Sequence, residues 1–145
     1  MTPSSALTAV IARLTAAGLV QARSPLGVSK ASSQRISRSF SVQPTSIGPS
    51  GSPGRGKPAV DGLRVVQVFQ VTLGHTIKPG DGLEGPSQAL QDYHSALKYI
   101  SANGTSLTTQ GAIIFSAAGH AYAGGGAFLL TPFSLNVTYE LTLVI

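Results

Sequence analysis

The chain has 145 residues, a length that fits one domain with a single hydrophobic core. It is 42% hydrophobic but only 10% charged, well below the share typical of soluble proteins, which indicates a surface covered by a partner or one made of small Gly, Ser and Thr residues. The absence of cysteine excludes disulfides, thiolate metal sites and a cysteine nucleophile, and no apolar run approaches the roughly 20 residues that span a bilayer.

The net charge of +5 is distributed unevenly along the chain. Residues 1–60 hold seven basic residues and no acid, whereas residues 61–145 hold three basic residues against five acids. This asymmetry indicates contact with a polyanion or an acidic neighbouring subunit, unless the basic half is only a solvated loop region. The candidate residues for contact with another subunit or with DNA are Arg35, Arg38, Arg55, Lys57 and Arg64.

The first predicted element is a helix over residues 4–17. Thr2 suits the N-cap, Pro3 the first helical position and Gly18 the position just after the helix. The residues with the i, i+3, i+4, i+7 spacing of one buried stripe are Leu7, Val10, Ile11 and Leu14. Residues 21–33 are rich in small polar side chains and predict a loop.

Residues 36–42 alternate in polarity and predict a strand, with Ile36, Arg38, Phe40 and Val42 on one face. An arginine on an apolar face must reach a sheet edge, an acid or another subunit. Residues 43–62 then contain four prolines and five glycines in twenty positions, which predicts an irregular segment. Because it separates two strands, we expect a long extension that is flexible or bound to a partner.

Residues 63–73 predict a central strand, followed by a loop at 74–86 and a helix at 87–102 that Pro86 opens. The apolar face predicted for this helix consists of Leu90, Tyr93, His94, Leu97 and Ile100. Residues 112–117 predict a short strand, and the glycines at 124–126 a mobile turn.

The terminal strand, Phe133 to Val144, has the clearest pattern in the sequence. Apolar residues occupy every odd position from 133 to 145, and polar residues fill the even positions up to 142. Most strands run about 5–6 residues. We therefore expect this strand to bend around the domain or to project and pair with another chain, and in either case to be covered.

One stretch comes close to a phosphate-binding loop. Gly51–Lys57 matches the first seven positions of the P-loop pattern, but Pro58 stands where Ser or Thr holds magnesium. No predicted strand precedes the stretch and no predicted helix follows it, so a helix N-terminus that could bind phosphate is missing. We expect no nucleotide site here.

The histidines and acids show no pattern of a catalytic or metal site. His75, His94 and His120 match no metal-ligand spacing, and we expect structural roles for them. Asp81 and Glu84 share a glycine-rich loop and make a poor carboxylate pair, and no G-x-S-x-G nucleophile elbow occurs. The sequence thus predicts no catalytic residue, no metal, no cofactor and no enzymatic activity.

The order of the predicted elements resembles that of the tail-terminator proteins (tail-completion, or U-type minor tail proteins) of long-tailed bacteriophages. The resemblance covers most of the chain and rests on the helix at 4–17, the strand Arg38-Ser39-Phe40-Ser41-Val42, residues 63–73 after the long insertion, the helix at 87–102 and the strand from Phe133 to Val144. The chain departs from the family in its low charge and in its proline-rich stretch at 43–62.

The resemblance implies an α+β fold, with two helices packed on a mostly antiparallel sheet and a long loop or hairpin extension, in a single domain over residues 1–145. It also implies a hexameric ring of identical copies that caps the tail tube and joins it to the head-side connector. The protein would be made in the host cytoplasm and reside in the tail or neck of the virion. DNA would pass through the lumen and touch the ring non-specifically, and no membrane would be involved.

Two other functions stay open. A capsid decoration or cement protein would be expected as a β-sandwich, and two amphipathic helices count against that architecture. A small nucleic-acid-binding module would use the basic residues between 23 and 64. Phe40 is the only aromatic residue among the first 60, so a stacking platform for bases is missing and only loose phosphate attraction is expected.

Overall fold

A computed structural model describes residues 1–22, 38–49, 62–78, 80, 82–116, 118–123 and 127–142. The predictions that lie outside these residues concern the loop after residue 22, Ile36, the motif at 51–58, Asp81, the glycines at 124–126, the last three residues of the terminal strand, and Arg35, Arg55 and Lys57.

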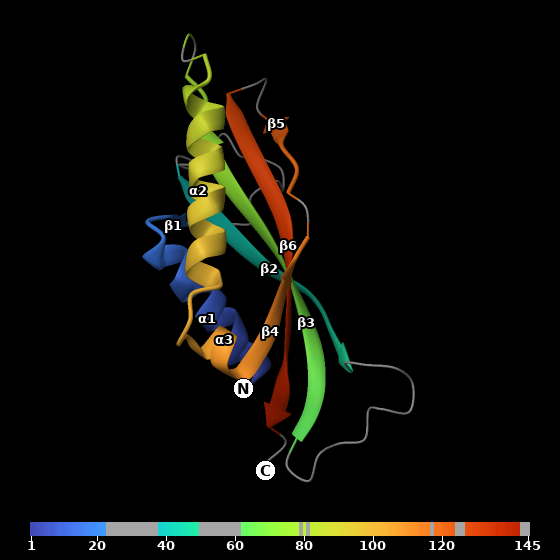
Figure 1. Cartoon of the computed structure of the whole chain (residues 1–145). Coiled ribbons are helices and arrows are strands. Elements are labelled where there is room, and N and C mark those ends of the chain that lie inside the picture. The colour runs from blue at the N-terminus through green and yellow to red at the C-terminus, as the bar shows by residue number, and fades with distance from the viewer. Residues whose placement is uncertain are drawn as a thin grey trace.

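The described residues form three helices and six strands, as Figure 1 shows. In chain order they are α1 (Pro3–Ala16), β1 (Val20–Gln21), β2 (Ser39–Pro49), β3 (Gly62–Thr76), α2 (Glu84–Ile100), α3 (Ser106–Gln110), β4 (Gly111–Phe115), β5 (Ala121–Ala123) and β6 (Phe128–Thr142). The strands form one sheet in the order β1-β2-β3-β6-β4, and β5 also pairs with β6. Only β1 and β2 are parallel. The predicted α+β class is therefore confirmed.

Helix α1 begins and ends where the sequence predicts. Thr2 and Ser5 form a reciprocal capping box, in which the Thr2 hydroxyl accepts the Ser5 N–H at 3.1 Å and the Ser5 hydroxyl accepts the Thr2 N–H at 2.9 Å. Pro3 occupies the first turn, where its missing N–H costs nothing. The helix ends at Ala16, and Gly18 just beyond it has a φ of 91° that side-chain-bearing residues rarely adopt.

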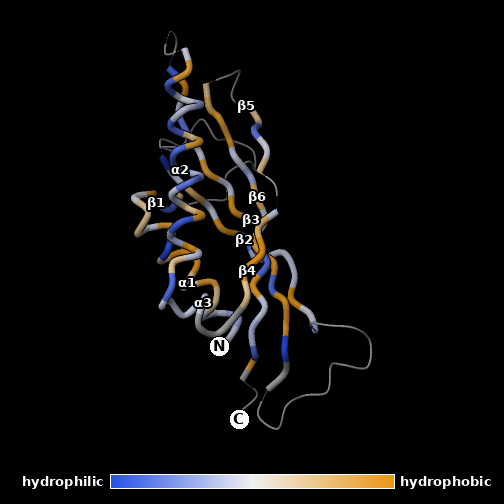
Figure 2. Tube along the Cα trace, viewed as in Figure 1, coloured by the Kyte–Doolittle hydropathy of each residue, from blue (hydrophilic) through white to orange (hydrophobic). Residues whose placement is uncertain are grey.

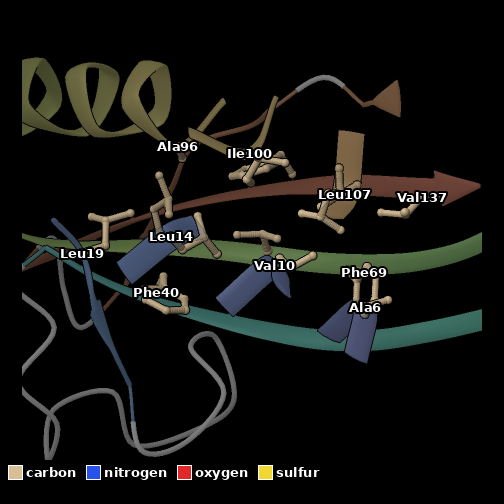
Figure 3. Close-up of a cluster of buried hydrophobic side chains, with 14 of the residues drawn as sticks. Ala6, Val10, Leu14, Leu19, Phe40, Phe69, Ala96, Ile100, Leu107 and Val137 are labelled. Atoms are coloured by element: carbon tan, nitrogen blue, oxygen red, sulfur yellow. The ribbon is translucent and has the colours of Figure 1, made fainter. Parts of the chain in front are cut away.

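All three helices lie on one face of the sheet, and the hydrophobic core lies between them and the strands (Figures 1 and 3). Figure 3 shows the buried face of α1 over the strands. Its fully buried residues are Ala6, Val10 and Leu14. Figure 2 shows apolar residues recurring along β3 and β6. Tyr139 is the largest fully buried residue, and its hydroxyl donates to Gln67 Oε1 at 2.7 Å, so its polar end is satisfied.

The terminal strand β6 is a central strand of the sheet. It pairs with β3 along its whole described length, from Gly62↔Thr142 to Thr76↔Phe128, and with β4 and β5 on its other side. The predicted alternation is confirmed, because Phe133, Leu135, Val137 and Tyr139 are buried and the even positions between them are partly exposed. The expectation that the strand needs cover is met within the chain itself, so its length is no argument for pairing with another subunit.

Strand β2 is longer than predicted. It continues through Pro49, whereas the proline and glycine content predicts irregular chain from residue 43, and that prediction is wrong for 43–49. A bulge between Pro44 and Ser46 accommodates the first proline, and the Thr45 hydroxyl there donates to the Val68 carbonyl at 3.2 Å. Prolines are tolerated because β2 is an edge strand along this stretch.

The buried face of α2 agrees only in part with the predicted one, since Ile100 is buried and Tyr93 and Leu97 pack against the core as expected. Its buried residues are Gly85, Ala89, Asp92, Ala96 and Ile100. Leu90 is 55% exposed and His94 is exposed, so their predicted burial is wrong. Small residues allow a close approach here, and a Cβ on Gly85 would overlap Cδ1 of Ile77.

Other element boundaries also differ from the predicted ones. The loop predicted at 74–86 is shorter in the structure, because β3 runs to Thr76 and α2 begins at Glu84. The elements that the sequence did not predict are the short β1, α3 and β5. No helix within the described ranges is both long and apolar enough to cross a membrane.

The alternation of β6 predicts a sharp contrast between neighbouring residues. Val137→Asp places an unpaired charge in the core, where Val137 is fully buried, and we expect a loss of more than about 3 kcal/mol in the free energy of unfolding. Thr138→Asp, on the opposite face, should cost less than about 1 kcal/mol. Urea unfolding measures both, and equal losses would contradict the assignment of faces.

Candidate functional site

A buried carboxylate forms the most concentrated polar cluster among the described residues. Asp92 projects from the buried face of α2, and its side chain is only 3% exposed. Three residues from different parts of the chain converge on it: Arg38 just before β2, His75 near the end of β3, and Gln88 one turn earlier on α2. The cluster therefore joins α2 to two neighbouring strands.

Both carboxylate oxygens of Asp92 are shared between two partners. Oδ1 accepts from Arg38 Nη2 and from Gln88 Nε2, each at 3.0 Å. Oδ2 lies 3.1 Å from Arg38 Nε and 2.7 Å from His75 Nε2. The Arg38 pair is the bidentate arrangement in which a planar guanidinium matches a carboxylate. Four nitrogen atoms of these three residues lie at hydrogen-bond distance from the carboxylate, so the acceptor capacity of Asp92 is filled.

His75 takes part in this cluster as a donor. An ionised carboxylate only accepts hydrogen bonds, so we assign the proton to Nε2 of His75. The other ring nitrogen, Nδ1, is buried and has no hydrogen-bond partner among the described residues. His75 is 2% exposed, which suits the structural role expected from the sequence, and it lies near the end of β3.

The electrostatics of the cluster favour the ionised forms of both charged partners. Burial by itself raises the pKa of Asp92, but the hydrogen bonds from Arg38, His75 and Gln88 and the charge of Arg38 together lower that pKa below its ordinary value. The hydrogen bond to Asp92 and the negative charge of Asp92 raise the pKa of Arg38. The pair is thus charged throughout the physiological range.

Arg38 reaches the cluster through an unusual backbone conformation. Its φ is 49°, the one positive φ of a residue other than glycine in the described ranges, and such a conformation costs of order 1 kcal/mol or more. The chain turns there and enters β2 at the next residue. The ion pair with Asp92 offsets this cost. The expectation that Arg38 must reach an edge, an acid or another subunit is met by the acid.

This arrangement fixes structure and is poorly suited to catalysis. A general base needs a free lone pair within reach of a substrate and a pKa near the working pH. Asp92 has its oxygens occupied, is almost fully buried and has a lowered pKa. The cluster therefore acts as an anchor for α2. In the parts of the chain that the structure describes, no group of three His, Asp or Glu residues is placed to hold a metal ion.

Two of the predicted contact residues lie in the described part of the chain, Arg38 and Arg64, and these two are not gathered into one patch. Arg38 lies next to the β2 residue that pairs with Gly74, and Arg64 lies near the start of β3. Ten residues of strand separate those two levels of β3, which corresponds to about 30 Å. Arg64 is exposed and stands opposite Glu140 across the β3–β6 ladder. Arg38 is half exposed, with its guanidinium held by Asp92.

The surface also contains two hollows. One is open and lies at the start of α2; its lining residues are Leu83, Glu84, Ser87, Gln88 and Gln91. The other lies between α1 and the start of α3, beside Arg13 and Thr105. Neither contains a buried polar group directed at a ligand.

Sequence reasoning missed Asp92 because it assigned the buried face of α2 from large apolar residues alone. A usable signal is present, since Asp92 has Ala89 three residues before it and Ala96 four residues after it, on one face of small residues. Arg38 lies on the apolar face of the predicted strand and needs an acid there. Asp92 was therefore a candidate partner for Arg38. Comparisons with known proteins give no further guidance: no family model matches the sequence, and no curated protein matches it.

Removing the charge of Asp92 tests the anchor. Asp92→Asn keeps the size of the side chain but leaves Arg38 without its counter-charge, and we expect a loss of about 2–4 kcal/mol in the free energy of unfolding. The matched control is Glu84→Gln, which removes an exposed acid of the same helix and should change stability by less than about 0.5 kcal/mol. Chemical denaturation measures both, and an unaffected Asp92→Asn variant would show that the cluster does not anchor α2.

The lowered pKa of Asp92 also predicts a pH dependence. The ionised form is favoured in the folded state, so this contribution is fully present above the unfolded pKa of about 4 and is lost as the pH falls through the lower folded value. The stability difference between the wild type and Asp92→Asn should therefore shrink between about pH 5 and pH 2. Unfolding curves recorded across that range test the sign, and a difference that grows on acidification would contradict it.

Proposed function

We propose that this chain is a structural subunit that assembles with copies of itself into a ring, as tail-terminator proteins of long-tailed bacteriophages do. The observation that carries the proposal is the outer half of β2, residues 44–49, which we call the β2 arm. Its outward side has no partner strand among the described residues, and Figure 1 shows it bending away from the helices at the far end of the sheet.

The β2 arm is exposed along most of its length. Ile47 has 48% of its surface exposed, and both prolines of the arm are also exposed. The core of this domain is complete without these side chains, because the buried residues come from the helices and from other parts of the strands. An exposed apolar side chain on this edge strand suits contact with a neighbouring subunit. In the proposed ring, the arm of each copy lies on the next copy.

The α+β architecture supports this function over a decoration protein. A β-sandwich requires two sheets packed face to face, whereas the described residues form one sheet with helices on one face. In the proposed role the ring caps the tail tube, contacts the head-side connector and surrounds the passing DNA. The protein would then be found in the tail or neck of the virion, and it would perform no catalysis.

The mass of the purified chain tests the proposal directly. Native mass measurement with low-resolution imaging should show a closed ring, six copies being the expected number, and the protein should not be retained on DNA at physiological salt. A chain that stays a compact monomer under all conditions would overturn the proposal. Salt-dependent retention on DNA without a ring would support the nucleic-acid-binding module instead.

A variant in the β2 arm tests where the ring contact lies. Ile47→Asp should leave the free energy of unfolding within about 1 kcal/mol of the wild type, because the side chain is half exposed, and should abolish the ring. The matched control is Leu83→Asp, which places the same charge at an 81% exposed leucine before α2 and should leave the ring intact. A ring that survives Ile47→Asp would place the contact elsewhere.

A further inference from the structure

The edge formed by β2 is protected against the addition of another strand. The Phe40 carbonyl accepts a hydrogen bond from Ala22, so the main chain of Phe40 points to the outer side of the sheet, and by alternation so does that of Pro44. The bulge after Pro44 shifts the alternation by one residue, which brings Pro49 to the outer side as well. Both prolines therefore stand where a strand arriving from outside would need an N–H.

The opposite edge, formed by β4, lacks this protection. Ser116 donates to the Ser134 carbonyl, so the even positions of β6 face β4 and form the ladder with Ala112 and Ile114. The outward-pointing main-chain groups are those of Gly111, Ile113 and Phe115. The strand contains no proline, no bulge and no charge, and Ile114 is 64% exposed on the face away from the helices.

Charged side chains are also missing from the stretch of sequence around this edge. No Asp, Glu, Lys or Arg occurs from Tyr99 to Tyr139, a stretch that includes α3, β4, β5 and most of β6. Natural edge strands are usually blunted by charges, above all by lysine. In a chain with a net charge of +5, a charge-free edge is also a surface on which two copies can meet without placing like charges opposite each other.

The sequence of β4 is complementary in size to itself. When two copies of Gly111–Phe115 are placed antiparallel about a two-fold axis through Ile113, Phe115 of each copy stands opposite Gly111 of the other, and Ile114 opposite Ala112. Phe115 and Ile114 thus each face a small residue, and Ile113 on the axis faces its own copy. The outward main-chain groups of 111, 113 and 115 would then form hydrogen-bonded pairs across the axis.

We propose that β4 pairs antiparallel with β4 of a second copy of this chain and joins two sheets into one continuous sheet. The contact covers Ile114, which is exposed in the single chain, and uses the outward peptide groups of the strand. It does not depend on the proposed ring, because a two-fold contact closes on itself and cannot build a ring alone. If both contacts form, the two-fold contact joins subunits that belong to two different rings.

Cross-linking tests the geometry of this contact. The chain has no cysteine, so Ile113→Cys introduces a single thiol, which the two-fold axis places next to its own copy. Hydrogen-bonded antiparallel pairs have a Cα separation of about 5.5 Å, within the range that disulfides span. Mild oxidation should give a covalent dimer at micromolar concentration. The control Ile47→Cys, in the β2 arm, should not cross-link, and failure of Ile113→Cys to do so would overturn the proposal.

A proline substitution tests whether main-chain pairing is required. Ile113→Pro removes an outward N–H and leaves the ladder between β4 and β6 intact, so the chain should fold while the two-fold dimer is lost. Should this variant not fold, Ile114→Lys serves the same purpose, because it alters only an exposed side chain. Analytical ultracentrifugation measures the dimer, and we expect at least a tenfold weaker association for either variant.

The outcomes separate this contact from the proposed ring. Loss of pairing in the β4 variants with the ring retained, and the reverse for Ile47→Asp, would support both proposals. A dimer without any ring would leave the β4 contact standing and remove the proposed function. A wild-type chain that is monomeric at about 100 µM, or β4 variants that associate as well as the wild type, would overturn the β4 contact, since strand addition in a specific dimer is expected at or below that concentration.

Discussion

The pairing of β3 with β6 is the interaction on which the rest of this structure depends. The two strands stay in register from Gly62↔Thr142 to Thr76↔Phe128, so the buried odd positions, 65 to 75 in β3 and 129 to 139 in β6, share the face that packs against the helices. A slip of one residue would turn that whole buried row to the other side of the sheet. Strand β2 adds to one side of this pair, and β4 and β5 add to the other, while the helices cover its apolar face (Figures 1 and 2).

Asp92 decides how α2 lies on that face. A buried ion pair adds little net stability compared with apolar residues of the same size, but other orientations of the helix would leave a charge buried and unpaired. In the observed orientation, Arg38 and His75 both reach Asp92, and small residues above and below it let the helix approach the sheet closely. Larger apolar residues such as Leu90 are left at the surface as a result. Pairing Asp92 with its polar partners thus contributes more to this orientation of α2 than burying Leu90 would.

The two edges of the sheet differ in their protection against strand addition, and this difference bears on how copies of the chain could assemble. The β2 edge carries prolines on its outward side, so in the proposed ring its contacts with a neighbour would come from side chains such as that of Ile47. The outward peptide groups of β4 have no partner strand among the described residues, and in a two-fold pair Phe115 and Ile114 would each face a small residue of the other copy. A single small domain that uses both edges has one contact for head-to-tail assembly and another for two-fold pairing.

The features that depend on local chemistry can be predicted from the sequence alone. The capping residues around α1 and the alternation of Phe133 to Tyr139 follow from backbone geometry and periodicity, which act over a few neighbouring residues. The α+β class was expected from the resemblance in the order of the elements, and the sheet and helices confirm it. The strand character of 43–49 was not predictable in this way, because tolerance of proline depends on whether the strand lies at an edge.

The features that depend on long-range pairing can be read only from the tertiary structure. The central place of β6 follows from its partners on both sides, and the cover that the strand needs comes from its own chain. The role of Asp92 follows from residues 54 and 17 positions away along the chain, Arg38 and His75, which no local pattern brings together. Periodicity shows which residues prefer burial; which polar group is buried with them depends on where its partners lie once the sheet has formed.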